Sequence, residues 1–103
     1  MAHDVFAYGE FLKDPVLKRM LGRVPKKVPA KLRGYRKFLD DILGFYNLVV
    51  EEEGVVEGGL LLGLTDDELL ELDKFESSKY HRIAVTVETA AGPSEAWAYI
   101  GRA

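Results

Sequence analysis

The sequence predicts an α+β fold, a small and mainly antiparallel β-barrel with two or so flanking helices. Its 103 residues, 48% hydrophobic and 30% charged, have the size and composition of a single domain spanning residues 1–103. Six or so short apolar segments have strand character and follow one another across short turns. Only two segments carry the apolar spacing of a helix. Strands that are adjacent in sequence tend to pair antiparallel, and a small set of them closes into a barrel.

The chain opens with a predicted strand followed by a short helix. Residues 5–8 form an apolar run that stops at Gly9. Asp14 is expected to cap a helix that has Pro15 at its first position, and Gly22 is expected to end it.

The next stretch is predicted to be extended. Two prolines at 25 and 29 disfavour a helix there. Residues 30–39 are expected to form a strand that bends or bulges at Gly34. The acidic and glycine residues within 40–44 mark a loop.

Two further strands are predicted over 46–50 and 55–64. Residues 51–54 have the sequence Glu-Glu-Glu-Gly. We expect this acidic segment to be the turn of a hairpin that joins the two strands.

The second helix has a clear start signal. Thr65 and Glu68 form a capping-box pattern, which predicts a helix over 66–76. Residues 80–89 and 95–100 then read as a final pair of antiparallel strands, joined by a Gly-Pro turn.

Charge and cysteine usage exclude several classes of function. The formal net charge is −3, which argues against a nucleic-acid partner. The basic stretch 23–37 is interpreted as the solvated side of an extended segment, with a phosphate- or carboxylate-facing patch as the alternative. No cysteine is present, so disulfides and thiol catalysis are excluded. His3 and His81 are isolated and predict no metal site. Without a signal peptide or a long apolar run, we expect a cytoplasmic protein with no membrane contact.

Glu76 is the residue that conflicts with its surroundings. It shares a helical stripe with Leu69 and Leu72, so it follows the apolar face. It also lies at the negative C-terminal end of the helix dipole. Burial and dipole would both raise its pKa towards the range of a general acid/base. The alternative is a frayed, solvated end or an ion pair with Lys79 or Arg82, and the pattern alone favours that alternative.

The second candidate feature is the segment Tyr8-Gly9-Glu10-Phe11. A strand that ends in glycine and turns towards a helix exposes backbone N–H groups, which bind carboxylates or oxyanions. The alternative is an ordinary turn that requires glycine, and the pattern alone favours it.

Four motifs in order resemble those of the γ-glutamylcyclotransferase-like (AIG2-like) family, over nearly the whole chain. The first is Tyr8-Gly9-Glu10-Phe11, which is similar to the Tyr-Gly-x-Leu motif of that family. The others are Leu32-Arg33-Gly34-Tyr35, Val56-Glu57-Gly58, and Leu72-Asp73-Lys74-Phe75-Glu76 followed by Tyr80 and Arg82.

The resemblance implies a fold and an activity. The fold is a small barrel with flanking helices, and the enzymes release 5-oxoproline from a γ-glutamyl substrate without a metal or organic cofactor. It implies that Glu76 is the general acid/base, that the N–H groups of Gly9, Glu10 and Phe11 hold the glutamyl oxygens, and that Tyr8 and Tyr80 line the pocket. The implied partner is a small γ-glutamyl molecule, and the implied assembly is a monomer or homodimer. Alternatives are a non-catalytic binding module of the same fold and a structural protein.

The sequence departs from the family pattern at the first motif. Glu10 stands where a small hydroxyl residue is usual, and Phe11 stands where leucine is usual. A carboxylate that points inward at position 10 would repel an acidic substrate. Because of this departure, the sequence does not identify the leaving group of the substrate.

Overall fold

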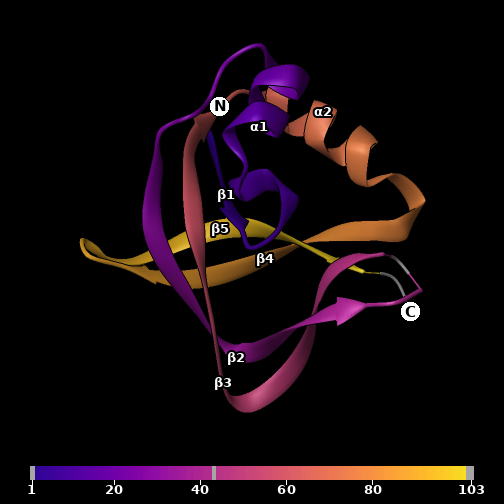
Figure 1. The fold of residues 1–103 in the computed structure, drawn as a ribbon. Helices are drawn as coiled ribbons and strands as arrows, with labels where there is room; N and C mark the ends of the chain where they lie inside the picture. The colour runs from indigo at the N-terminus through magenta and orange to yellow at the C-terminus, as the bar shows by residue number, and fades with distance from the viewer. Residues whose placement is uncertain (1, 43, 102–103) are drawn as a thin grey trace.

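The protein folds into a closed five-stranded barrel with both helices at one end (Figure 1). The computed structural model describes residues 2–42 and 44–101. The strand order is β1-β3-β2-β4-β5, and every pair is antiparallel except the closing pair of β1 and β5. The fold class predicted from the sequence is therefore confirmed. The strands are β1 (His3–Ala7), β2 (Lys27–Asp40), β3 (Phe45–Leu64), β4 (Tyr80–Thr89) and β5 (Gly92–Gly101); the helices are α1 (Asp14–Leu21) and α2 (Asp66–Glu76), with 3₁₀ turns η1 (Glu10–Leu12) and η2 (Ser77–Lys79).

The predicted hairpin at residues 51–54 is wrong. The acidic segment lies inside β3, which runs through it as one strand of 20 residues. The chain reverses direction earlier, at the loop before Phe45 that the sequence did predict. The glutamates of the segment are all exposed. A run of exposed charges therefore marks a solvated stretch of strand as readily as a turn.

The same segment bends the β2–β3 hairpin. Arg33 pairs with Val55, and the next paired residue, Tyr35, lies opposite Val50. Gly34 thus faces the four residues of the acidic segment across a bulge, and its φ of 89° is a conformation that favours glycine. The predicted bend at this glycine is confirmed. Figure 1 shows both ribbons turning together in the lower part of the view, which carries the far half of the hairpin, residues 35–50, back towards the end of α2. We call this far half the arm.

Helix α1 begins one residue earlier than predicted. Asp14 is the first residue inside the helix, and Lys13 occupies the N-cap. The Asp14 carboxylate lies 3.0 Å from the Lys27 ammonium instead of capping the backbone. Gly22 ends the helix as predicted, in a left-handed conformation.

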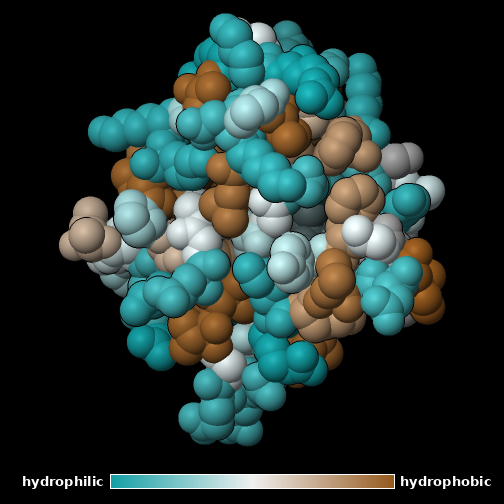
Figure 2. Space-filling model, in the orientation of Figure 1, coloured by the Kyte–Doolittle hydropathy of each residue, from teal (hydrophilic) through white to brown (hydrophobic). Residues whose placement is uncertain are grey.

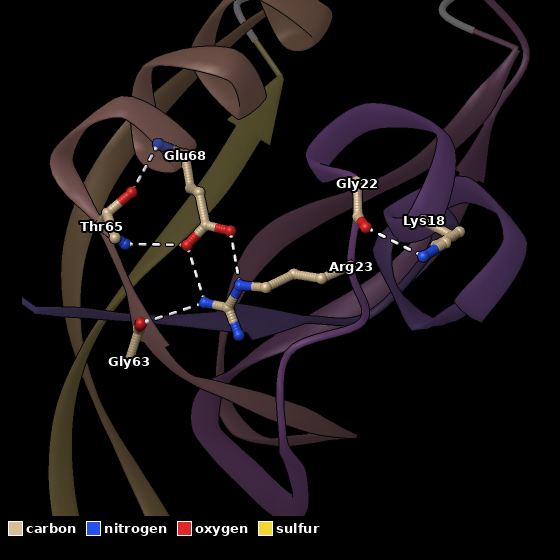
Figure 3. Close-up of polar contacts among 6 residues, drawn as sticks. All are labelled: Lys18, Gly22, Arg23, Gly63, Thr65 and Glu68. Atoms are coloured by element: carbon tan, nitrogen blue, oxygen red, sulfur yellow. Dashed lines mark hydrogen bonds and ion pairs between the residues drawn. The ribbon is translucent and has the colours of Figure 1, made fainter.

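Helix α2 has the predicted bounds and the predicted capping box. The Glu68 N–H donates to Thr65 Oγ1 (3.1 Å), and the Thr65 N–H donates to Glu68 Oε1 (3.0 Å). Figure 3 shows that Arg23 adds a clamp, with Nε and Nη2 each 2.7 Å from a Glu68 carboxylate oxygen. The same guanidinium donates to the Gly63 carbonyl at 3.3 Å. The start of α2 is therefore fixed to the end of β3.

Strand β1 separates two apolar clusters. Val5 and Ala7 pack towards α1 and α2, whereas Phe6 and Tyr8 pack with residues of the barrel strands. The alternation places Tyr8 at the mouth of the barrel, where the chain leaves β1. It also places the segment that follows directly beside the end of α2.

The basic stretch lies mostly on the surface. Arg33 pairs with Glu88, and Arg36 lies 3.7 Å from Glu51. Both arginines are exposed, as expected for the solvated side of a strand. In the described part of the chain, no helix is long and apolar enough to cross a bilayer.

Candidate active site

A cavity of about 240 Å³ opens at the mouth of the barrel, between the end of β1, the tip of the arm and the end of α2. Its floor is made by buried aromatic side chains, and its rim by half-exposed ones. Apolar side chains run down the right of Figure 2, over the end of α2 and the tip of the arm. All six residues singled out from the sequence line the cavity: Tyr8, Gly9, Glu10, Phe11, Glu76 and Tyr80. The floor also contains Tyr99, and the rim contains Phe45, Tyr46, Phe75 and Lys79.

Glu76 reaches the cavity because α2 is amphipathic. Leu69 and Leu72 are buried against the barrel, and Glu76 follows them as the last residue of the helix. Burial, and secondly the negative charge of Glu10, raise the pKa of Glu76 from 4.5 to about 7. The carboxyl group is therefore poised to gain or lose a proton near neutral pH.

The ion pair between Arg82 and Glu76 considered from the sequence does not form. Arg82 Nε lies 3.4 Å from Asp73 Oδ1 instead, and its guanidinium stacks over Trp97 at 4.3 Å. The Arg82 charge is thus held away from Glu76, one turn back along α2.

The glycine turn faces the same cavity. The Leu12 N–H donates to the Gly9 carbonyl and the Lys13 N–H donates to the Glu10 carbonyl, both at 3.0 Å, which closes η1. The first N–H groups of such a turn have no partner within it. They are therefore left for an acceptor outside the turn.

Tyrosine hydroxyls fix the floor. Tyr80 donates to the Tyr46 carbonyl at 2.9 Å, Tyr8 donates to the Tyr99 carbonyl, and Tyr99 donates to Asp73 Oδ1 at 2.5 Å. Burial is the main cause that raises the pKa of Tyr8, Tyr80 and Tyr99, that of Tyr80 to about 12. The phenols therefore stay protonated at neutral pH and act as hydrogen-bond donors in the floor.

Sequence reasoning missed the contribution of the arm. Tyr46 and Phe45 line the cavity only because the arm bends at Gly34, and no local pattern separates them from core aromatics. Lys37 holds the arm in place, with its ammonium 4.6 Å from the centre of the Tyr46 ring and 3.4 Å from the Tyr8 carbonyl. Tyr99 is buried and also forms part of the floor.

No group of three side chains within residues 2–42 and 44–101 is placed to hold a metal ion.

A family model described as gamma-glutamyl cyclotransferase, AIG2-like, matches residues 5–103, and the chain belongs to this family. AIG2-like protein A of Arabidopsis thaliana is 39% identical over 85 residues, which are 82% of this chain and 52% of that protein. A protein of Methanocaldococcus jannaschii, named as a γ-glutamylcyclotransferase and also as a candidate RNase, is 39% identical over 74 residues, 72% of this chain and 33% of its own.

Solved structures agree with the fold. An Arabidopsis thaliana protein determined in solution superposes with a TM-score of 0.88 at 34% identity, covering 96% of this chain and 68% of that one. A structure titled gamma-glutamyl cyclotransferase gives a TM-score of 0.84 at 18% identity, covering 99% and 68%, and shows the fold alone. The chain spans between one third and just over half of the length of the curated relatives it matches.

Proposed function

We propose that this protein is a γ-glutamyl cyclotransferase, which converts a γ-glutamyl amide into 5-oxoproline and a free amine. One observation carries the proposal: the Glu76 carboxyl group, with its pKa near 7, faces the same cavity as the Gly9–Phe11 turn. Family membership supports this reaction class.

In the proposed reaction, Glu76 moves protons between two nitrogens. The Glu76 carboxylate takes a proton from the substrate α-ammonium, and the resulting amine nitrogen forms a bond to the γ-carbonyl carbon. The amide C–N bond then breaks, and Glu76 returns a proton to the leaving nitrogen. The α-nitrogen loses two protons in total, and the leaving group gains two to depart as an ammonium ion. A carboxyl group near its pKa serves both transfers, and such catalysis contributes about 10²–10⁴-fold.

The rest of the cavity positions the substrate. The free N–H groups of the turn would hold the glutamyl oxygens, as donors aimed at developing negative charge. The buried floor of Tyr8, Phe11 and Tyr80 would exclude water. Holding the amine and the carbonyl within one ring-forming geometry supplies much of the remaining acceleration.

The test is the release of 5-oxoproline from γ-glutamyl amides by the wild type and by Glu76→Gln. We expect Glu76→Gln to lower kcat by at least about 10²-fold, with an unchanged circular dichroism spectrum. The matched control is Glu71→Gln, on the exposed side of the same helix, which should retain wild-type activity. Full activity of Glu76→Gln would contradict the mechanism. Tight binding of the amides by the wild type without turnover would favour the non-catalytic binding module instead.

A further inference from the structure

The rim of the cavity carries an unusual charge. Glu10, the departure from the family pattern, lines the cavity at the first residue of η1, and its side chain is one third exposed (33%). Its Oε1 accepts from the Lys13 ammonium at 3.0 Å. Lys13 is itself 62% exposed, and exposed pairs of this kind contribute little to stability, so a cation of a ligand is able to replace it.

Carboxylates contribute to the electrostatic field inside the cavity at several points. Besides burial, which is the largest cause in each case, the charge of Glu10 raises the pKa of Glu76, and that of Glu76 raises the pKa of Tyr8. Glu76 and Asp40 act in the same direction on Tyr80. A positive charge in this cavity would therefore be stabilised from more than one side.

Two lysines oppose these carboxylates: Lys37, whose ammonium lies 4.6 Å from the centre of the Tyr46 ring, and Lys79. Lys79 lines the rim on the side of η2 and is exposed, so its ammonium is largely solvated. It would attract a carboxylate at the same opening. The alternative to a preference for cationic substrates is therefore a preference for anionic ones.

The aromatic rim complements the acid. Phe45, Tyr46 and Phe75 are between 41% and 48% exposed around the opening. Aromatic faces attract cations, and because the Lys37 ammonium already lies over Tyr46, the faces of Phe45 and Phe75 are the ones considered for a ligand. A carboxylate that lines the same cavity as such rings suits the binding of an ammonium group.

We propose that Glu10 makes this cavity selective for γ-glutamyl amides whose leaving amine carries a second, positively charged group. The inference rests on the proposed function, in which the glutamyl head occupies the floor and its own α-ammonium meets Glu76. The variable part of the substrate then leaves through the rim, where Glu10 meets its distal ammonium.

The experiment compares three γ-glutamyl amides of equal length, whose leaving amines are the four-carbon α,ω-diamine, pentylamine and δ-aminovalerate. They differ only in a distal ammonium, methyl or carboxylate group. For the wild type we expect kcat/KM to be about 3- to 10-fold higher for the cationic amide than for the neutral one, and lowest for the anionic one. The ratio should shrink at high salt, because the rim is exposed. In Glu10→Gln the three values should converge.

The dissociation constants of the same amides, measured by calorimetry, separate this inference from the reaction. One result would reject the proposed reaction and still support the role of Glu10. In that result no amide is turned over, but the wild type binds the cationic amide most tightly and Glu10→Gln does not. The control is Glu95→Gln, which removes the same charge from an exposed position on β5 outside the cavity. The inference would be overturned if the wild type bound the three amides equally or preferred the anionic one. It would also be overturned if the preference for the cationic amide remained in Glu10→Gln, or if Glu95→Gln lost that preference as well.

Discussion

At the scale of single residues, the position of Glu76 destabilises the folded state when the carboxyl group is ionised, and the same position suits the group to proton transfer. Its place on the apolar stripe of α2 removes water from the carboxyl group, and Glu10 adds a like charge. Both effects oppose ionisation, so the folded protein holds a proton that the unfolded chain would release. The group that is suited to proton transfer is therefore expected to weaken the fold at high pH.

This leads to a pH-dependent prediction for stability. Below pH 4.5 the Glu76 carboxyl group is protonated in both states and costs nothing. Between pH 4.5 and about 7 only the unfolded chain ionises fully, so wild-type stability falls as the pH rises. Glu76→Gln lacks this penalty. Its free energy of unfolding should equal that of the wild type near pH 4 and exceed it by about 1 kcal/mol near pH 8, after allowing for partial exposure. Urea titrations at the two pH values measure this, and an equal difference at both would contradict it.

At the scale of elements, the start of α2 fixes where Glu76 ends up. The capping box and the Arg23 clamp anchor the first turn to β3, and ten residues later the helix ends at the cavity. A helix that frays at its start loses this anchor, although its apolar face still packs.

Thr65→Ala tests that anchor. It removes the side-chain acceptor of the Glu68 N–H and should lower the free energy of unfolding by about 1 kcal/mol. Thr65→Ser keeps the hydroxyl group and should remain within about 0.5 kcal/mol of the wild type. Thermal and urea unfolding give both values. Equal losses in the two variants would mean that the methyl group, and not the cap, matters.

The elements that were predicted correctly carry local signals. The capping box, the stop at Gly22 and the stripe ending at Glu76 each depend on residues within a turn or two of one another. The hairpin at 51–54 was predicted wrongly because the register of a strand pair depends on the residues of both strands. Gly34 on β2 lies opposite the acidic segment, which therefore forms a bulge and not a turn. For the same reason the role of Tyr46 could not be read from the sequence.

At the scale of the whole molecule, the buried side chain of Asn47 links two strands of the barrel. Asn47 Oδ1 accepts from the Leu48 N–H and from the Gly101 N–H, both at 2.7 Å, and thereby joins β3 to the end of β5. Asn47 is 7% exposed. Its amide ties the arm to the barrel next to the cavity.

Asn47→Leu keeps the approximate volume and removes this acceptor. Two N–H groups then lose their partner, and we expect a loss of about 1–3 kcal/mol in the free energy of unfolding. Hydrogen exchange at Gly101 should accelerate more than exchange in the middle of β4. A variant with native stability, or with uniform acceleration, would show that the arm is held by other contacts.

The parallel pair of β1 and β5 has a consequence for folding kinetics. It joins the first and last strands, through the pairing of Val5 with Trp97, so the chain must close a loop of almost its full length. Such distant contacts slow folding, because entropy is lost before the contact is made. The cavity draws its lining from residues near both ends of the chain, Tyr8 and Tyr99 among them. The complete cavity therefore requires β1 to pair with β5, and the recovery of ligand binding during refolding would report when this pairing forms.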